Sequence, residues 1–155
     1  KEEDLPTLRA YNPVGNRKYK CDTDPEELTS GMISKFMEDV LGEKITPIYK
    51  TEEKPAYNGD TVKIVVGTTW NEIVMDQTKD VFVMYYAPWC KYSKEMQLPW
   101  IELSQLMGYN PDMVIAKMDG NANEAPGLFI KHFPTLVYYP KGNKNGIMFN
   151  DTDID

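Results

Sequence analysis

An uninterrupted apolar run at residues 81–86 constrains the fold of this chain more than any other feature. A strand that is apolar at every position, rather than at alternate ones, is typical of a parallel strand covered on both faces. Residues 90–107 follow with apolar side chains at helical spacing, and Gly108 ends that pattern. A buried strand that leads into a long helix indicates an α/β fold.

The segments around this strand and helix alternate between the same two kinds of element. We expect, in chain order, a strand at 62–66, a short helix at 69–76, a strand at 113–118, a weak helix at 123–131 and a hairpin of strands at 135–139 and 146–149. Parallel strands joined through helices, followed by a terminal hairpin, predict a mixed central sheet flanked by helices.

The first part of the chain predicts a separate, smaller unit. Residues 5–11 and 19–21 indicate a hairpin, and Asp24 followed by proline is a typical helix start. Apolar residues then recur at helical spacing, among them Leu28, Met32, Phe36 and Val40. We expect this apolar stripe to belong to a core that the chain itself does not supply.

These patterns divide the chain into residues 1–44, a charged and proline-containing linker at 45–60, and residues 61–155. The residues around Pro6 resemble those around Pro134, at an offset of 134 − 6 = 128. A repeat near one domain length favours two copies of one fold, of which the chain holds the end of the first and most of the second, without its last helix. Chance similarity between two strand–turn–strand segments is the alternative.

Composition excludes several classes of function. The 17 Lys and Arg against 24 Asp and Glu give a net charge of −7, which argues against sequence-independent nucleic-acid binding. The longest apolar run, residues 81–89, is far too short to predict a membrane span. Cys21 and Cys90 cannot form a disulfide framework, and the single His132 belongs to no His/Cys cluster, so we expect neither a metal nor a cofactor.

Cys90 is the residue that most suggests chemistry. It follows a Pro-Trp turn and opens a helix, where unbonded backbone N–H groups and the helix dipole stabilise a thiolate. Lys91 and Lys94 bring positive charge close by. A thiol that only fills space is the alternative, and we favour that alternative for Cys21.

Four motifs give the chain a family resemblance. They are Tyr-Ala-Pro-Trp-Cys at 86–90, Val-Ile-Ala-Lys-Met-Asp at 114–119, Ala-Asn-Glu at 122–124 and Phe-Pro-Thr-Leu at 133–136. In this order they resemble the thioredoxin-fold second catalytic domain of protein disulfide isomerases, and residues 1–50 resemble the end of the preceding non-catalytic thioredoxin-like domain. The resemblance implies that Cys90 is the nucleophile and that Pro134 is a cis proline facing it. It also implies a substrate surface formed by Trp89, Tyr92, Phe133, Pro134 and Thr135.

The chain departs from this family at the positions that matter for turnover. Ser93 stands where the family has its second cysteine, so the motif is Cys-Lys-Tyr-Ser, and Tyr92 replaces the usual histidine. Met84 stands where the family buries a glutamate, although the partner lysine persists as Lys117. Without the glutamate we favour a Lys117 with a packed stem and a solvated head over a catalytic buried charge. Because several positions differ together, a natural single-cysteine domain is favoured over an engineered trap.

The sequence therefore predicts disulfide isomerase-like thiol exchange on unfolded, cysteine-containing proteins of the endoplasmic reticulum lumen. Cys90 would form mixed disulfides that a client thiol or glutathione releases, within a longer protein that has further thioredoxin-like domains. Asn150 begins a glycosylation pattern that suits a secretory chain. The alternative is a chaperone or structural subunit that binds unfolded peptides through the same surface without redox chemistry.

Overall fold

The computed structural model describes residues 6–14 and 17–149, and these divide into two units. The first unit holds the residues up to 49 together with 126–129. The second begins at residue 50 and holds the rest. Each unit has its own small set of buried residues, so the two are described in turn.

The first unit is a hairpin and a helix. Strands β1 (Arg9–Asn12) and β2 (Arg17–Lys20) pair antiparallel, and α1 (Ser30–Leu41) follows. Asp24 caps only a short 3-10 turn, η2 (Pro25–Glu27). The predicted helix start at Asp24 is therefore wrong, since Thr29 is the residue whose side chain accepts the Met32 N–H and caps α1.

The core of the first unit is small. Tyr19, Cys21 and Phe36 are its buried members, and Leu28 and Val40 pack against them. Other apolar residues of α1 are substantially exposed: Met32, Ile33 and Met37 to about 40% each and Leu41 to 79%. Within this unit the apolar stripe is thus only partly covered, and its assignment to a preceding domain stays a prediction.

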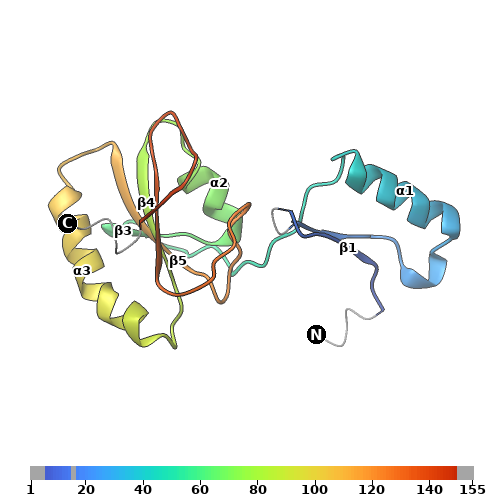
Figure 1. The fold of residues 1–155 in the computed structure, drawn as a ribbon, viewed down its shortest axis with the longest axis horizontal. Coiled ribbons are helices and arrows are strands. Elements are labelled where there is room, and N and C mark those ends of the chain that lie inside the picture. Colours follow the sequence, from blue (N-terminus) through green and yellow to red (C-terminus); the bar gives the residue numbers. More distant parts are fainter. Residues whose placement is uncertain (1–5, 15–16, 150–155) are drawn as a thin grey trace. The chain divides into compact units, whose positions relative to one another are not determined.

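The second unit is built on a five-stranded mixed sheet in the order β3-β5-β4-β6-β7 (Figure 1). Its strands are β3 (Val62–Ile64), β4 (Asp80–Tyr86), β5 (Met113–Asp119), β6 (Thr135–Tyr139) and β7 (Ile147–Phe149). The first three run parallel, while β6 and β7 add antiparallel at one side. The predicted mixed sheet and all of its strands are confirmed, with ends that shift by up to two residues.

Helices cover both faces of this sheet (Figure 1). The long helix is α3 (Lys91–Met107), and a 3-10 turn, η3 (Gly67–Thr69), leads into the short α2 (Trp70–Ile73). On the α3 face, Met84 and Trp100 lie in one core cluster. On the other face, Trp70 donates to the Tyr85 hydroxyl at 3.1 Å. Strand β4 is therefore buried on both faces, as its apolar run predicts.

The structure differs from the sequence expectations in two connecting segments. Residues 123–131 form an irregular loop with a turn at 126–127 rather than a weak helix, and Gly127 has a φ of +74°, a left-handed conformation that interrupts a helix. Much of the expected linker belongs to the second unit: Asn58 exchanges hydrogen bonds with the backbone of Ile64, and residues 50–52 bond to the loop after β5. These contacts join side chains to backbone groups, which a search for apolar periodicity cannot detect.

Candidate active site

Cys90 lies where β4 gives way to α3. The chain leaves β4 at Tyr86 and turns through residues 87–90, with the Cys90 N–H donating to the Ala87 carbonyl at 3.1 Å. Cys90 has an extended backbone conformation and is the N-cap of α3. Its sulfur therefore faces the backbone N–H groups of the first turn, which have no partner within the helix.

The environment of Cys90 lowers the pKa of its thiol. The main cause is the backbone N–H of Ser93, followed by the Ser93 hydroxyl, and the Tyr92 N–H contributes in the same direction against the opposing effect of burial. Lys91 and Lys94, which the sequence offers as nearby positive charge, are not among these causes, and Lys91 pairs with Glu95 at 3.6 Å. Hydrogen bonds, rather than cations, stabilise this thiolate.

Ser93 occupies the position where a second sulfur would lie. It is only 1% exposed, and its Oγ accepts the N–H of Ala87 at 3.3 Å while hydrogen-bonding the Cys90 sulfur. The hydroxyl thus fixes the turn before the helix and solvates the thiolate at the same time. It cannot form a disulfide.

The loop before β6 brings the opposite wall of the site. The peptide bond between Phe133 and Pro134 is cis, as predicted, and the Cys90 thiol donates to the Phe133 carbonyl at 3.3 Å. Thr135 pairs with Tyr85 at the end of β4, and its hydroxyl donates to the His132 carbonyl at 2.6 Å. Residues 43 positions apart in the sequence therefore meet at the sulfur.

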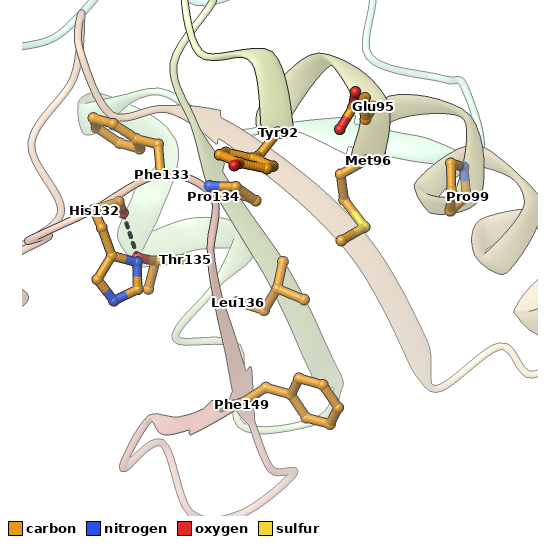
Figure 2. Close-up of a pocket in the computed structure, with 10 residues that line it drawn as sticks. All are labelled: Tyr92, Glu95, Met96, Pro99, His132, Phe133, Pro134, Thr135, Leu136 and Phe149. Atoms are coloured by element: carbon orange, nitrogen blue, oxygen red, sulfur yellow. Dashed lines mark hydrogen bonds between the residues drawn. The ribbon is translucent and has the colours of Figure 1, made fainter. Parts of the chain in front are cut away.

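An apolar groove of about 670 Å³ runs beside this loop (Figure 2). Tyr92 stands next to Pro134 at one end, and Met96 and Leu136 point into the middle (Figure 2). The full lining consists of Tyr92, Glu95, Met96, Pro99, His132, Phe133, Pro134, Thr135, Leu136 and Phe149. Four of the five residues expected to bind substrate line the groove.

Trp89, the fifth, lies beside the groove rather than in it. Its ring is 66% exposed and meets the Phe133 ring edge to face at 5.9 Å between centroids. The indole N–H donates to Asn121 Oδ1 at 3.5 Å. Asn121 was not predicted from the sequence, although it lies two residues after the Val-Ile-Ala-Lys-Met-Asp motif, at the active-site end of β5.

Lys117 differs from both sequence interpretations. It is half-buried rather than a buried charge, and its head is not simply solvated, since Nζ donates to Gln97 Oε1 at 3.0 Å and lies 5.7 Å from the centroid of the Tyr86 ring. Met84, its register partner on β4, is fully buried and offers no carboxylate. Gln97, one helical turn after Ser93, was missed because a lone glutamine carries no pattern.

Three further sequence expectations concern glycosylation, metal binding and membrane spans. Asn150 lies outside the described residues. Over residues 6–14 and 17–149, no group of three His, Cys, Asp or Glu side chains is arranged to hold a metal ion. No helix in the same residues is long and apolar enough to cross a membrane.

A model of a known protein family covers both the sheet and the cysteine turn. The family model described as thioredoxin matches residues 61–153. The chain belongs to the thioredoxin family. The predicted thioredoxin fold is confirmed, and the cysteine turn, the cis proline and the mixed sheet all lie within the matched part.

The relatives carry names that agree with the family resemblance. The chain is 43% identical to protein disulfide isomerase-like 1-4 of Oryza sativa over 90% of its length, and 36% identical to human protein disulfide-isomerase A2 over 92%. These matches cover 24% and 27% of the two relatives, so the chain spans about a quarter of their length. The solved first thioredoxin domain of mouse protein disulfide-isomerase A4 aligns at a TM-score of 0.49 and 18% identity, over 66% of this chain and 70% of that domain.

Proposed function

We propose that this chain carries out disulfide isomerase-like thiol–disulfide exchange through Cys90 alone. The observation that carries the proposal is the Cys90 sulfur, which lies at the start of α3, is hydrogen-bonded by Ser93 and touches the Phe133 carbonyl. A nucleophilic thiolate beside an apolar groove suits attack on a disulfide of an unfolded protein. The similarity to proteins named disulfide isomerases supports the same conclusion.

The chemistry needs two exchanges and no outside oxidant. The Cys90 thiolate attacks one sulfur of a client disulfide, forms a mixed disulfide and releases a client thiolate. A second client thiolate, or glutathione, then attacks the mixed disulfide and frees the Cys90 thiolate. Where both sulfurs come from the client, its disulfides are rearranged without net oxidation or reduction.

Because residue 93 is a serine, this cycle lacks the reactions that need a second cysteine. A dithiol enzyme uses its second cysteine to release itself from a client, and the buried Ser93 hydroxyl cannot do so. We therefore infer that mixed disulfides persist until another thiol reaches Cys90. Trp89, Tyr92, Phe133, Pro134 and Thr135 would hold the client, and Lys117, hydrogen-bonded to Gln97, would serve the structure rather than proton transfer.

The proposal also covers the full-length protein, its clients and its compartment. Since the chain spans about a quarter of its relatives, we infer further thioredoxin-like domains in the full protein. The names of the relatives, disulfide isomerases, favour cysteine-containing clients. From the family resemblance we infer the endoplasmic reticulum lumen as the compartment and glutathione as a second releasing thiol. Glycosylation at Asn150 would agree with that compartment.

Rearrangement of a scrambled protein substrate tests the proposal. Cys21→Ser should retain the recovery of native disulfides in a glutathione buffer, and the double variant that adds Cys90→Ala should lose it. Neither of these should oxidise a reduced dithiol peptide without glutathione. A Ser93→Cys variant, which restores two sulfurs, should gain a disulfide between Cys90 and the introduced cysteine, and with it that oxidising activity. Recovery that is independent of Cys90 would contradict the proposal.

A binding module is the second candidate, favoured by the exposed aromatic side chains beside the sulfur. Trp89 and Tyr92 are 66% and 69% exposed and adjoin the apolar groove. Protection of an unfolded client from aggregation distinguishes the two functions. If Cys90→Ala retains full protection and the wild type shows no thiol exchange, the binding module is correct.

A further inference from the structure

Residues 50–52 run beside the loop that follows β5, and we call them the strap. The Glu124 N–H donates to the Lys50 carbonyl at 2.9 Å, and the Lys50 N–H donates back to Glu124 Oε2 at 3.1 Å. The Lys50 ammonium donates to the Asn121 carbonyl at 2.7 Å. A short bond from a charged donor is stronger than one between neutral groups, so this contact anchors the loop at Asn121.

Asn123 connects the strap to the rest of the loop. Its side chain is 1% exposed and makes four hydrogen bonds. The Oδ1 atom accepts the N–H groups of Glu52 at 2.8 Å and Gly67 at 3.2 Å, and Nδ2 donates to Glu52 Oε2 at 2.7 Å and the Asp119 carbonyl at 3.1 Å. A buried amide whose full bonding capacity is used holds its neighbours in one arrangement.

The loop in turn touches two residues of the active site. Asn121 Oδ1 accepts the Trp89 indole N–H at 3.5 Å. The Phe133 ring lies against the backbone of Gly120, where an added Cβ would come within 2.6 Å of the ring. Phe133 also supplies the carbonyl that accepts the Cys90 thiol. A continuous set of contacts therefore leads from the strap to the sulfur.

We propose that Lys50 and Glu52 are positioning residues that hold Trp89 and Phe133 beside Cys90. They touch neither the sulfur nor the groove, and they act through Asn121 and Asn123. The proposal rests on the proposed function, since it assigns Trp89 and Phe133 to client binding. It gives a role to a segment whose charged sequence predicts only a solvated linker.

Lys54 provides a matched control. It is an exposed lysine of the same connecting segment, and the contact that the structure gives its ammonium is with the exposed Glu72 at 3.6 Å. Such surface pairs contribute little to stability. Lys50→Met and Lys54→Met each remove one positive charge and keep most of the stem, so they differ mainly in the bond to the loop.

Relaxation of the Trp89 indole ¹⁵N–H in the full chain tests the positioning step. The chain has three indole signals, and the one that is lost in Trp89→Phe belongs to Trp89. In the wild type and in Lys54→Met we expect an order parameter near the rigid value of about 0.85, and in Lys50→Met a value below about 0.6. Lys50→Arg, which can still donate to the Asn121 carbonyl, should restore the wild-type value. An unchanged indole in Lys50→Met, or an equal change in Lys54→Met, would overturn the proposal.

Exchange rates separate this proposal from the proposed function. A Trp-free peptide that carries a nitrothiobenzoate mixed disulfide should react with Lys50→Met about threefold more slowly than with wild type, as expected from a weakened hydrogen bond. The same chromophore on free cysteine should react equally with both, because the thiolate itself is unchanged. If the wild type fails to exchange at all, the proposed function fails, while the indole relaxation still decides the positioning step. Equal peptide rates in wild type and Lys50→Met overturn the positioning proposal alone.

Discussion

At the scale of single residues, the site depends on what surrounds one sulfur. Ser93 contributes both its N–H and its hydroxyl to the Cys90 thiolate, and these are the two largest causes of its lowered pKa. The same hydroxyl accepts the Ala87 N–H. A serine at this position thus preserves the acidity of the nucleophile while it removes the sulfur that would release a client.

Replacement of Ser93 by alanine should raise the pKa of Cys90 without returning it to the ordinary value. The hydroxyl bond is lost, but the backbone N–H remains. The rate of alkylation by iodoacetamide against pH, measured in a Cys21→Ser background, gives the midpoint. A midpoint that does not move on Ser93→Ala would show that the hydroxyl does not stabilise the thiolate.

The lowered pKa of Cys90 also makes stability depend on pH. The folded state loses its thiol proton at a lower pH than the unfolded state, whose thiol has the ordinary pKa of about 8.5. Stability from this group is therefore lost as the pH falls through the folded pKa, and it is fully present above the unfolded value. The difference in unfolding free energy between Cys21→Ser and the double variant with Cys90→Ala should rise with pH across this window. A difference that is constant with pH would contradict a lowered pKa.

At the scale of elements, strand β4 and helix α3 present the site. Apolar contacts hold them to the sheet, together with a buried polar contact in which the Trp100 indole donates to the Ala116 carbonyl at 2.9 Å. Trp100 also packs against Phe82 at 4.8 Å between ring centroids. This fixes α3 on β5, and with it the helix start that stabilises the thiolate.

Loss of the Trp100 hydrogen bond should therefore weaken the second unit. Trp100→Phe removes the indole donor to the buried Ala116 carbonyl, and we expect the free energy of unfolding to fall by about 1–3 kcal/mol. Trp89→Phe is the control: Trp89 is 66% exposed, and we expect a change within about 0.5 kcal/mol. Urea denaturation followed by circular dichroism measures both. Equal losses in the two variants would argue against the buried contact.

The start of α1 can be tested in the same way. Thr29 caps this helix and Asp24 caps only the preceding turn. Thr29→Ala should weaken the first turn of α1 by about 1 kcal/mol. Amide exchange at Met32 and Ile33 should accelerate accordingly, whereas Asp24→Ala should leave these amides nearly unchanged. If these amides exchange faster in Asp24→Ala and not in Thr29→Ala, the helix start at Asp24 that the sequence predicts would be correct.

At the scale of the whole molecule, the two units differ in how much core they contain. Among the described residues, the first has three buried apolar side chains, while in the second the central strand β4 is buried on both faces. The sequence predicts that the second unit begins at residue 61, whereas in the structure it begins at residue 50. The intervening segment contains the strap and Asn58. The stabilities of two fragments that begin at these residues distinguish the two boundaries.

A fragment of residues 50–155 should be more stable than one of residues 61–155. The shorter fragment leaves the Asn123 side chain without Glu52, and a buried polar group left unsatisfied costs about 1–3 kcal/mol. Thermal unfolding of the two fragments, with Asn123→Ala in both, measures the effect. The variant should reduce the difference between them, and equal stability of the unmodified fragments would contradict a structural role for residues 50–52.

The features that depend on neighbours along the chain could be predicted from the sequence alone. The apolar run of β4 and the helix that Cys90 opens are local patterns. The cis proline before β6 and the missing second sulfur at residue 93 follow from the family resemblance that the short motifs carry. The folded structure was needed to show that Lys117 bonds to Gln97, that Asn121 meets Trp89 and that the strap holds Asn123. Their partners lie 20, 32 and 71 positions apart. Polar side chains of this kind can bond to almost any backbone or side-chain group, so a partner is selected only when the folded sheet places one within reach.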